Sequence, residues 1–138
     1  TSFLEMCKNR AYKSHVPMCI HLDHGATMEQ VQRAIRCGFT SVMIDASSES
    51  FEDNIKITKE VIKVAHPLGV SVEAELGTIG DIKEDSGNRE IGSKEIIFTK
   101  PEDAKKFVEE TGCDTLAIAI GTAHGIRSTS RAGITYRN

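Results

Sequence analysis

The chain has 138 residues, of which 39% are hydrophobic and 27% charged, and its net charge is −3. This composition is typical of a globular protein, and the negative charge, with no nucleic-acid-binding motif, argues against nucleic acid as a partner. No apolar run approaches the roughly 18–20 residues of a membrane span, and the N-terminus lacks the apolar segment of a signal peptide. We therefore expect a cytoplasmic protein with no membrane partner.

The first part of the chain alternates between strand and helix patterns. A short apolar run predicts a strand over Val16–Leu22. Thr27 is expected to start a helix, because Gln30 stands three residues on and can reach back in a capping box. Gly38 is suited to end this helix, and the next apolar run predicts a strand over Thr40–Asp45.

The alternation continues to residue 121. The expected elements are a helix that Ser50 can cap and that ends before His66-Pro67, a strand over Val70–Leu76, a long loop over Gly77–Lys94, a helix over Thr99–Thr111 and a strand over Asp114–Gly121. The last helix is predicted to begin with a second capping box, formed by Thr99 and Glu102. Long loops without a period of their own are often functional.

This order of elements predicts a parallel sheet covered by helices, in the α/β class. A doubly wound sheet and a (β/α) barrel both fit the alternation. No G-x-G-x-x-G or Walker loop follows any of the predicted strands, so nothing in the sequence supports the nucleotide-binding version of the fold.

Ionisable side chains stand at or near the carboxyl end of every predicted strand. They are Asp23, His24, Asp45, Glu73, Glu75 and His124. Because the carboxyl ends of parallel strands meet at one edge of a sheet, we expect residues far apart in the sequence to converge there. Two imidazoles and a carboxylate are a usual zinc set, so His24, His124 and Glu75 are the candidate ligands. Asp23 is the candidate general acid or base.

Simpler roles fit several of these residues when each is taken alone. His124 in a His-Gly dipeptide is typical of a turn, and Asp45 at a strand end can cap a helix or loop. Glu73 and Glu75 share one face of a strand and could form ion pairs, while His21 is expected to be a hydrogen-bonded structural histidine. Their joint occurrence at the ends of successive strands favours the metal site.

Four stretches resemble class II, metal-dependent aldolases of the fructose-bisphosphate and tagatose-bisphosphate group. They are IHLDHGAT, GFTSVMIDASSESFEDNIKITKEV, GVSVEAELGTIG and AIAIGTAHG, between about Val16 and Gly125. The family fold is a (β/α)8 TIM barrel of about 250 residues. The resemblance therefore implies that residues 1–138 form a single, partial barrel domain with about four strands, either a piece of a longer chain or completed by another copy. A homo-oligomer, dimer or tetramer, is expected.

The resemblance also assigns roles by position. His24 and His124 match zinc ligands, and Asp45 and Glu75 match acidic residues at or beside the metal. The remaining assignments are Asp23 for the proton of the substrate C4 hydroxyl, Glu84 or Asp85 for an acid delivered by the loop after Gly80, and Gly125 for a backbone contact with substrate phosphate. Zn2+ is the implied cofactor, and a second divalent or a monovalent cation is left open.

The implied reaction is the reversible aldol cleavage of a phosphorylated ketose. In glycolysis and gluconeogenesis this is fructose 1,6-bisphosphate, which gives dihydroxyacetone phosphate and glyceraldehyde 3-phosphate. None of the predicted strands carries the lysine that a Schiff-base route requires. The alternatives are a tagatose-bisphosphate aldolase and a truncated, non-catalytic module that binds metal or phosphosugar. The sequence departs from the family at Asp81, where a second glycine is common, and in the segment after Gly125.

Overall fold

The computed structural model describes residues 2–77, 80–81, 98–120 and 123–124, and for 80–81 and 123–124 it describes the backbone alone. The helices are α1 (Phe3–Tyr12), α2 (Met28–Arg36), α3 (Phe51–Ala65), the 3-10 turn η1 (His66–Leu68) and α4 (Pro101–Thr111). The strands are β1 (His21–Gly25), β2 (Ser41–Ile44), β3 (Ser71–Leu76), β4 (Gly80–Asp81), β5 (Thr115–Ile118) and β6 (Ala123–His124). The predicted sites Glu84, Asp85 and Gly125 lie outside the described residues.

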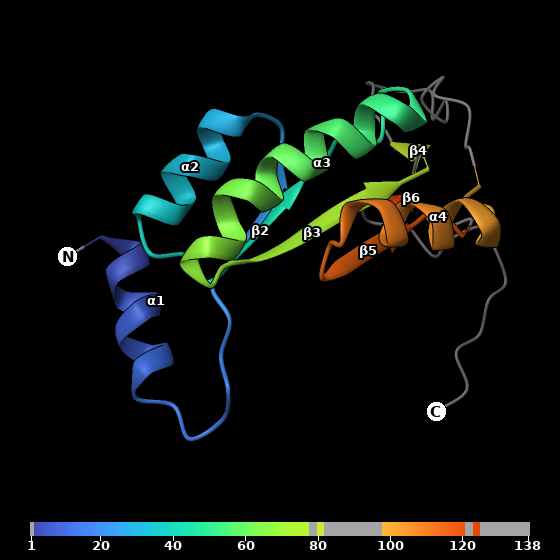
Figure 1. The fold of residues 1–138 in the computed structure, drawn as a ribbon. Helices are drawn as coiled ribbons and strands as arrows, with labels where there is room; N and C mark the ends of the chain where they lie inside the picture. The colour runs from blue at the N-terminus through green and yellow to red at the C-terminus, as the bar shows by residue number, and fades with distance from the viewer. Residues whose placement is uncertain (1, 78–79, 82–97, 121–122, 125–138) are drawn as a thin grey trace, which may run out of the picture.

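Four strands form one parallel sheet in the order β1-β2-β3-β5, and β4 pairs with β6 in a second, two-stranded parallel sheet. Figure 1 shows α2 and α3 side by side over β1, β2 and β3, with α4 beside β5. The strands alternate with these helices along the chain, as the sequence predicted. Every strand of the main sheet therefore ends at the same edge, here called the carboxyl edge.

The core lies between the sheet and its helices. Alternate residues of β2 and β3 point toward the helices and are buried: Val42, Ile44, Val72, Ala74 and Leu76. They pack against Val31 and Val61 in one cluster and against Phe107 in another. Burial of the valine, isoleucine and leucine side chains contributes about 1.5–3 kcal/mol each, so this face holds the sheet and its helices together.

The helix caps agree closely with the sequence pattern. Thr27 and Ser50 accept hydrogen bonds from the backbone N–H groups of Gln30 and Asp53, at 3.2 and 3.1 Å. Gln30 also reaches back as a capping box requires, but it accepts from the N–H of Ala26, one residue before the expected position. The predicted ends of α2 and α3 are confirmed.

Two predictions about element starts are wrong. The first strand is His21–Gly25 rather than Val16–Leu22, because pairing with β2 begins at His21 opposite Ser41, and Pro17 offers no N–H for a ladder. Thr99 does not cap α4. The cap is Lys100, and the Thr99 hydroxyl instead donates to the carbonyl of Leu76 while accepting from the N–H of Ala119 at 3.0 Å.

The outer edges of the main sheet are open within the part of the chain that the structure describes. Neither β1 nor β5 has a strand on its outer side there.

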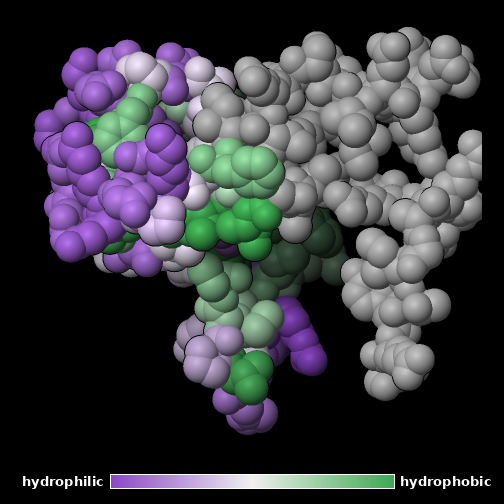
Figure 2. Space-filling view, turned by 90° about the vertical axis from the view of Figure 1, so that its right-hand side faces the viewer, coloured by the Kyte–Doolittle hydropathy of each residue, from purple (hydrophilic) through white to green (hydrophobic). Residues whose placement is uncertain are grey.

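The view in Figure 2 shows hydrophobic surface beside strongly hydrophilic surface. The exposed large apolar side chains around α4 and β5 are Phe98, Val108, Ile118 and Ile120. None of the described helices has the length and apolar character to cross a bilayer.

Candidate metal centre

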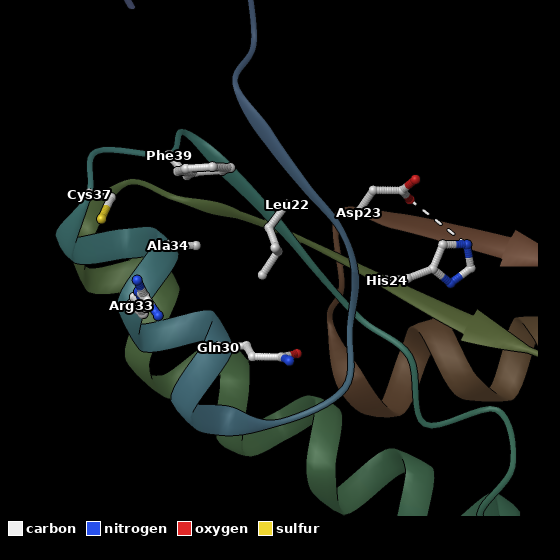
Figure 3. Close-up of a pocket in the computed structure, with 8 residues that line it drawn as sticks. All are labelled: Leu22, Asp23, His24, Gln30, Arg33, Ala34, Cys37 and Phe39. Atoms are coloured by element: carbon white, nitrogen blue, oxygen red, sulfur yellow. Dashed lines mark ion pairs between the residues drawn. The ribbon is translucent and has the colours of Figure 1, made fainter. Parts of the chain in front are cut away.

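The carboxyl end of β1 contains a β-bulge. Leu22 pairs with Val42 and Gly25 with Ile44. The two residues Asp23 and His24 therefore lie opposite the single β2 residue between Val42 and Ile44. His24 has a φ of 48°, in the left-handed region that residues other than glycine adopt uncommonly. In a regular strand, neighbouring side chains point to opposite faces. The bulge instead brings the Asp23 carboxylate to 4.0 Å from His24 Nε2, as Figure 3 shows.

Gly25 makes this bulge possible. A Cβ at residue 25 would lie 2.5 Å from the carbonyl oxygen of Met43 and 3.0 Å from the Leu22 side chain. The carbonyl belongs to the backbone of β2 and cannot give way without moving the strand. Glycine is therefore required here for the close approach of two strands.

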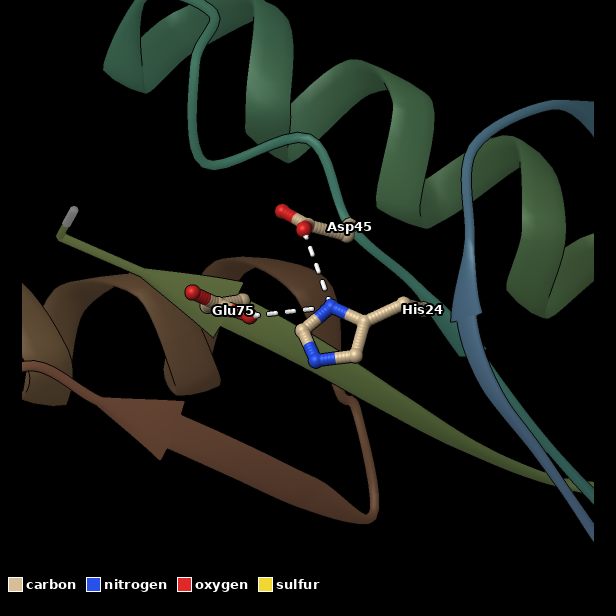
Figure 4. Close-up of side chains that lie close together, drawn as sticks. All are labelled: His24, Asp45 and Glu75. Carbon is tan, nitrogen blue, oxygen red and sulfur yellow. Dashed lines mark hydrogen bonds and ion pairs between the residues drawn. The ribbon is translucent and has the colours of Figure 1, made fainter. Parts of the chain in front are cut away.

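Three side chains from neighbouring strands converge at the carboxyl edge. His24 Nδ1 lies 3.1 Å from Asp45 Oδ2 and 3.8 Å from Glu75 Oε2 (Figure 4). One potential ligand atom from each residue lies within 4.8 Å of the others. These are three of the four metal ligands named from the sequence, and they come from the ends of β1, β2 and β3.

The fourth, His124, lies in β6. Its backbone pairs in parallel with Asp81 of β4. Because β4 follows the carboxyl end of β3 and β6 follows that of β5, this small sheet continues the main sheet beyond its carboxyl edge. His124 thus lies at the same edge by its backbone, which is the part of this residue that the structure describes.

The Asp45 carboxylate is oriented by its own turn. Its Oδ1 accepts hydrogen bonds from the Ser47 hydroxyl at 2.7 Å and from the Ser47 N–H at 3.1 Å, which leaves Oδ2 for His24. Burial alone would raise the pKa of Asp45, but the two hydrogen bonds from Ser47 and the one with His24 outweigh it, so the pKa is lowered. Asp45 is therefore a carboxylate with one oxygen directed at the cluster.

His24 stands in a negative environment. Its hydrogen bond with Asp45 raises the pKa of the imidazole, burial opposes this, and the charges of Asp23 and Glu75 raise it further. Glu75 is only 4% exposed, so its carboxylate is largely removed from water. Three carboxylates around one imidazole carry more negative charge than a single proton neutralises. A divalent cation with nitrogen and oxygen ligands fits this donor set.

His21 and Glu73 lie on the same face of the sheet as the cluster but form a separate set of contacts. His21 Nδ1 is hydrogen-bonded to the Ser41 hydroxyl at 2.8 Å, and its Nε2 lies 3.4 Å from Glu73 Oε2. His21 is thus hydrogen-bonded, as the sequence predicted for a structural histidine. The Glu73 carboxylate thus faces His21 across β2 and is not one of the three side chains of the cluster of His24, Asp45 and Glu75.

A cavity of about 390 Å³ opens between β1 and α2. Its lining residues are Leu22, Asp23, His24, Gln30, Arg33, Ala34, Cys37 and Phe39. In Figure 3, the Asp23 and His24 side chains extend away from α2, and Leu22 lies between Asp23 and the labelled residues of α2. The cavity therefore lies between β1 and α2 and reaches the bulge at Asp23 and His24.

Two residues hydrogen-bonded to members of the cluster were missed by sequence reasoning. They are Ser47, which holds Asp45, and Asn54, whose side chain amide donates to the carbonyl of Glu75 at 2.8 Å. An Asp-x-Ser sequence is a common local hydrogen-bonding pattern. Asn54 falls in the apolar stripe of α3, and a polar residue in such a stripe signals a buried hydrogen bond.

Comparisons with known proteins agree on one family. The family described as "Fructose-bisphosphate aldolase class-II" matches residues 1–136. The fructose-bisphosphate aldolase of Giardia intestinalis is 55% identical over 125 residues, which are 89% of this chain and 37% of the relative. That of Thermus caldophilus is 50% identical over 115 residues, which are 83% of this chain and 37% of the relative.

A solved structure shows the same likeness in three dimensions. The YdjI aldolase from Escherichia coli K12 matches with a TM-score of 0.74 and 43% identity, over 88% of this chain and 41% of that one. The prediction of a partial (β/α)8 barrel is confirmed by this likeness and by the four-stranded parallel sheet. The chain spans less than half the length of the relatives that it matches. Because the family match extends over nearly all of its residues, the chain belongs to the class II fructose-bisphosphate aldolase family.

Proposed function

We propose that the protein with this chain catalyses the reversible, metal-dependent aldol cleavage of fructose 1,6-bisphosphate to dihydroxyacetone phosphate and glyceraldehyde 3-phosphate. The observation that carries the proposal is the convergence of His24, Asp45 and Glu75 at the carboxyl edge, with Asp23 beside them. Family membership and relatives named fructose-bisphosphate aldolase support the choice of reaction and substrate.

The metal would be held by His24 and His124, with Asp45 and Glu75 as acidic ligands or close neighbours. The donor set of imidazole and carboxylates fits zinc, which we propose as the ion. When bound, the metal supplies a Lewis acid that polarises the ketose carbonyl. The bulge and the turn at Ser47 hold His24 and Asp45 in place before any ligand arrives.

Asp23 is the proposed base for the substrate hydroxyl. Its side chain is 78% exposed, in contrast to the nearly buried Glu75, so it is accessible to a substrate. In cleavage, the Asp23 carboxylate accepts the proton of the C4 hydroxyl as the C3–C4 bond breaks, and it returns the proton in condensation. We further propose Glu84 or Asp85 for the proton on the resulting carbanion carbon and the backbone of Gly125 for a substrate phosphate.

We place the protein in the cytoplasm, where the glycolytic substrate is made, and expect a dimer or tetramer. Tagatose 1,6-bisphosphate is the alternative substrate, since it differs from fructose 1,6-bisphosphate at C4, the carbon whose hydroxyl Asp23 serves. The alternative from another class is a module that binds metal or phosphosugar without turnover. One set of assays on the intact natural protein separates these three.

The assay follows triose phosphate release from each bisphosphate before chelation, after chelation and after addition of zinc. Chelation should abolish cleavage and zinc should restore it, with fructose 1,6-bisphosphate the better substrate. Zinc binding without cleavage of either sugar would favour the binding module and contradict the proposal. Asp23→Asn should lower kcat by roughly 10²–10⁴-fold with zinc retained. Glu109→Gln, an exposed carboxylate on α4, is the matched control and should leave kcat unchanged.

A further inference from the structure

The peptide of Glu75 lies where the pairing of β2 with β3 has already ended. The last paired residues are Ile44 and Ala74, and the next N–H of the β2 chain, that of Asp45, donates toward β1, to the carbonyl of Gly25 at 2.9 Å. The carbonyl of Leu76 accepts from the N–H of Ala119, on the β5 side. Since successive carbonyls of a strand point to opposite sides, that of Glu75 points toward β2, beyond the end of their ladder.

A side chain from a helix donates a hydrogen bond to this carbonyl. Asn54, in the first turn of α3, donates from Nδ2 to the Glu75 carbonyl at 2.8 Å. Asn54 is 1% exposed, and its Oδ1 accepts from the Thr58 hydroxyl at 3.3 Å. Both ends of the amide are therefore fixed, and in this buried place an unpaired donor or carbonyl would cost about 1–3 kcal/mol.

We propose that Asn54 is a positioning residue that sets the place of the Glu75 carboxylate in the metal centre. This inference rests on the proposed function. The carbonyl that Asn54 holds belongs to the same residue as the carboxylate that lies 3.8 Å from His24 Nδ1. Because the side chain of Glu75 is nearly buried, its position follows that of its backbone. A metal site tolerates displacements of only about 0.5 Å in its ligands.

A purely structural role would have a different signature. Thr111 is a matched case: it is 6% exposed, on α4, and its hydroxyl donates to the carbonyl of Phe107 at 2.7 Å, within helix α4. Loss of either buried hydrogen bond should lower stability. Loss of the bond from Asn54 should also weaken the metal centre, whereas loss of the bond from Thr111 should not.

The test compares Asn54→Leu with Thr111→Val in the intact natural protein, by calorimetric titration with Zn2+ and by NMR of the His24 imidazole in the metal-free state. Asn54→Leu should weaken zinc binding by roughly 10–100-fold, the range for residues that orient ligands, and should shift the His24 resonances. Thr111→Val should change neither. If Asn54→Leu does not fold, Thr58→Val takes its place, because it releases only the far end of the amide, and weaker zinc binding is again expected.

The possible outcomes separate this inference from the proposed function. A wild-type protein that binds no zinc would overturn the proposed function, and the inference with it. A wild-type protein that binds zinc, with a folded Asn54→Leu variant, or Thr58→Val in its place, that binds it equally well and leaves the His24 resonances unmoved, would overturn the inference alone.

Discussion

Two histidine–aspartate pairs lie at opposite ends of the strands of the main sheet, one at the carboxyl edge and one at the amino edge, where the strands begin. The distance between ring nitrogen and carboxylate oxygen is nearly the same in both. At the carboxyl edge, His24 Nδ1 is 3.1 Å from Asp45 Oδ2, and at the amino edge, His66 Nε2 is 2.9 Å from Asp114 Oδ2. The first pair has Glu75 and Asp23 beside it and a histidine in left-handed conformation. In the second, the Asp114 oxygen also accepts from the N–H of Val72 at 2.7 Å, which ties it to β3.

The difference shows that the pair by itself does not make a metal centre. At the carboxyl edge, further carboxylates and a bulge concentrate negative charge on one imidazole. At the amino edge, a backbone N–H satisfies the carboxylate and the pair joins η1 to the sheet. This agrees with the general division of parallel α/β folds, in which the carboxyl ends of the strands carry chemistry and the amino ends carry stability.

The largest expected contrast comes from replacing each histidine with asparagine. His24→Asn should weaken zinc binding by more than roughly 100-fold, since it removes a ligand where even an outer-shell change costs 10–100-fold. The fold should persist, because asparagine tolerates the left-handed conformation. His66→Asn should leave zinc binding unchanged. Calorimetric titration with Zn2+ and circular dichroism measure both, and equal zinc affinities in the two variants would remove the distinction between the edges.

The next contrast uses a glycine close to each histidine in sequence, Gly25 after His24 and Gly69 three residues after His66. Gly25→Ala places a methyl group against the Met43 carbonyl, so we expect a loss of about 1–3 kcal/mol in unfolding free energy. It should also weaken zinc binding, because the bulge must shift. Gly69→Ala, at a φ of 70° with open space around it, should cost about 1–2 kcal/mol through backbone strain and leave zinc binding intact. Urea unfolding and zinc titration measure the two quantities. A Gly25→Ala protein with normal zinc affinity would show that the bulge does not set the position of His24.

The smallest expected effect is on the pH dependence of the unfolding free energy, through Asp114 of the second pair. The hydrogen bond from Val72 N–H lowers the pKa of Asp114, burial opposes this, and His66 lowers it further. Because the pKa is lower in the folded than in the unfolded chain, the carboxylate stabilises the fold above pH about 4, and this contribution is lost as pH falls through the folded pKa. Asp114→Asn should therefore cost about 1 kcal/mol at pH 7 and less at pH 3. Urea unfolding at both values checks this, and an equal loss at both would contradict it.

The sequence predicted most of the elements that form the face of the sheet packed against the helices. Alternating apolar residues in β2 and β3, and capping residues such as Thr27 and Ser50, act over a few positions, so their outcome can be read locally. It also named the residues at the strand ends that the fold brings together. Helix α1 was not predicted, because it buries none of its residues and so lacks a strong apolar stripe.

The contacts around the cluster could not be predicted from local sequence patterns. Period two sends Asp23 and His24 to opposite faces, and the bulge that reverses this depends on how β1 pairs with β2, a contact between distant segments. Thr99 shows the same limit: its pattern fits a cap, but two strand ends use its hydroxyl instead. Asn54 is similar, since its partner lies on β3, 21 residues away.

A crystal structure of the intact natural protein grown with zinc, with an anomalous difference map at the zinc edge, tests the central claim most directly. We expect an anomalous peak in contact with the His24 imidazole and with at least one of the Asp45 and Glu75 carboxylates, and Asp23 outside the ligand sphere. Zinc bound only at other residues, or no zinc at these strand ends, would contradict the claim.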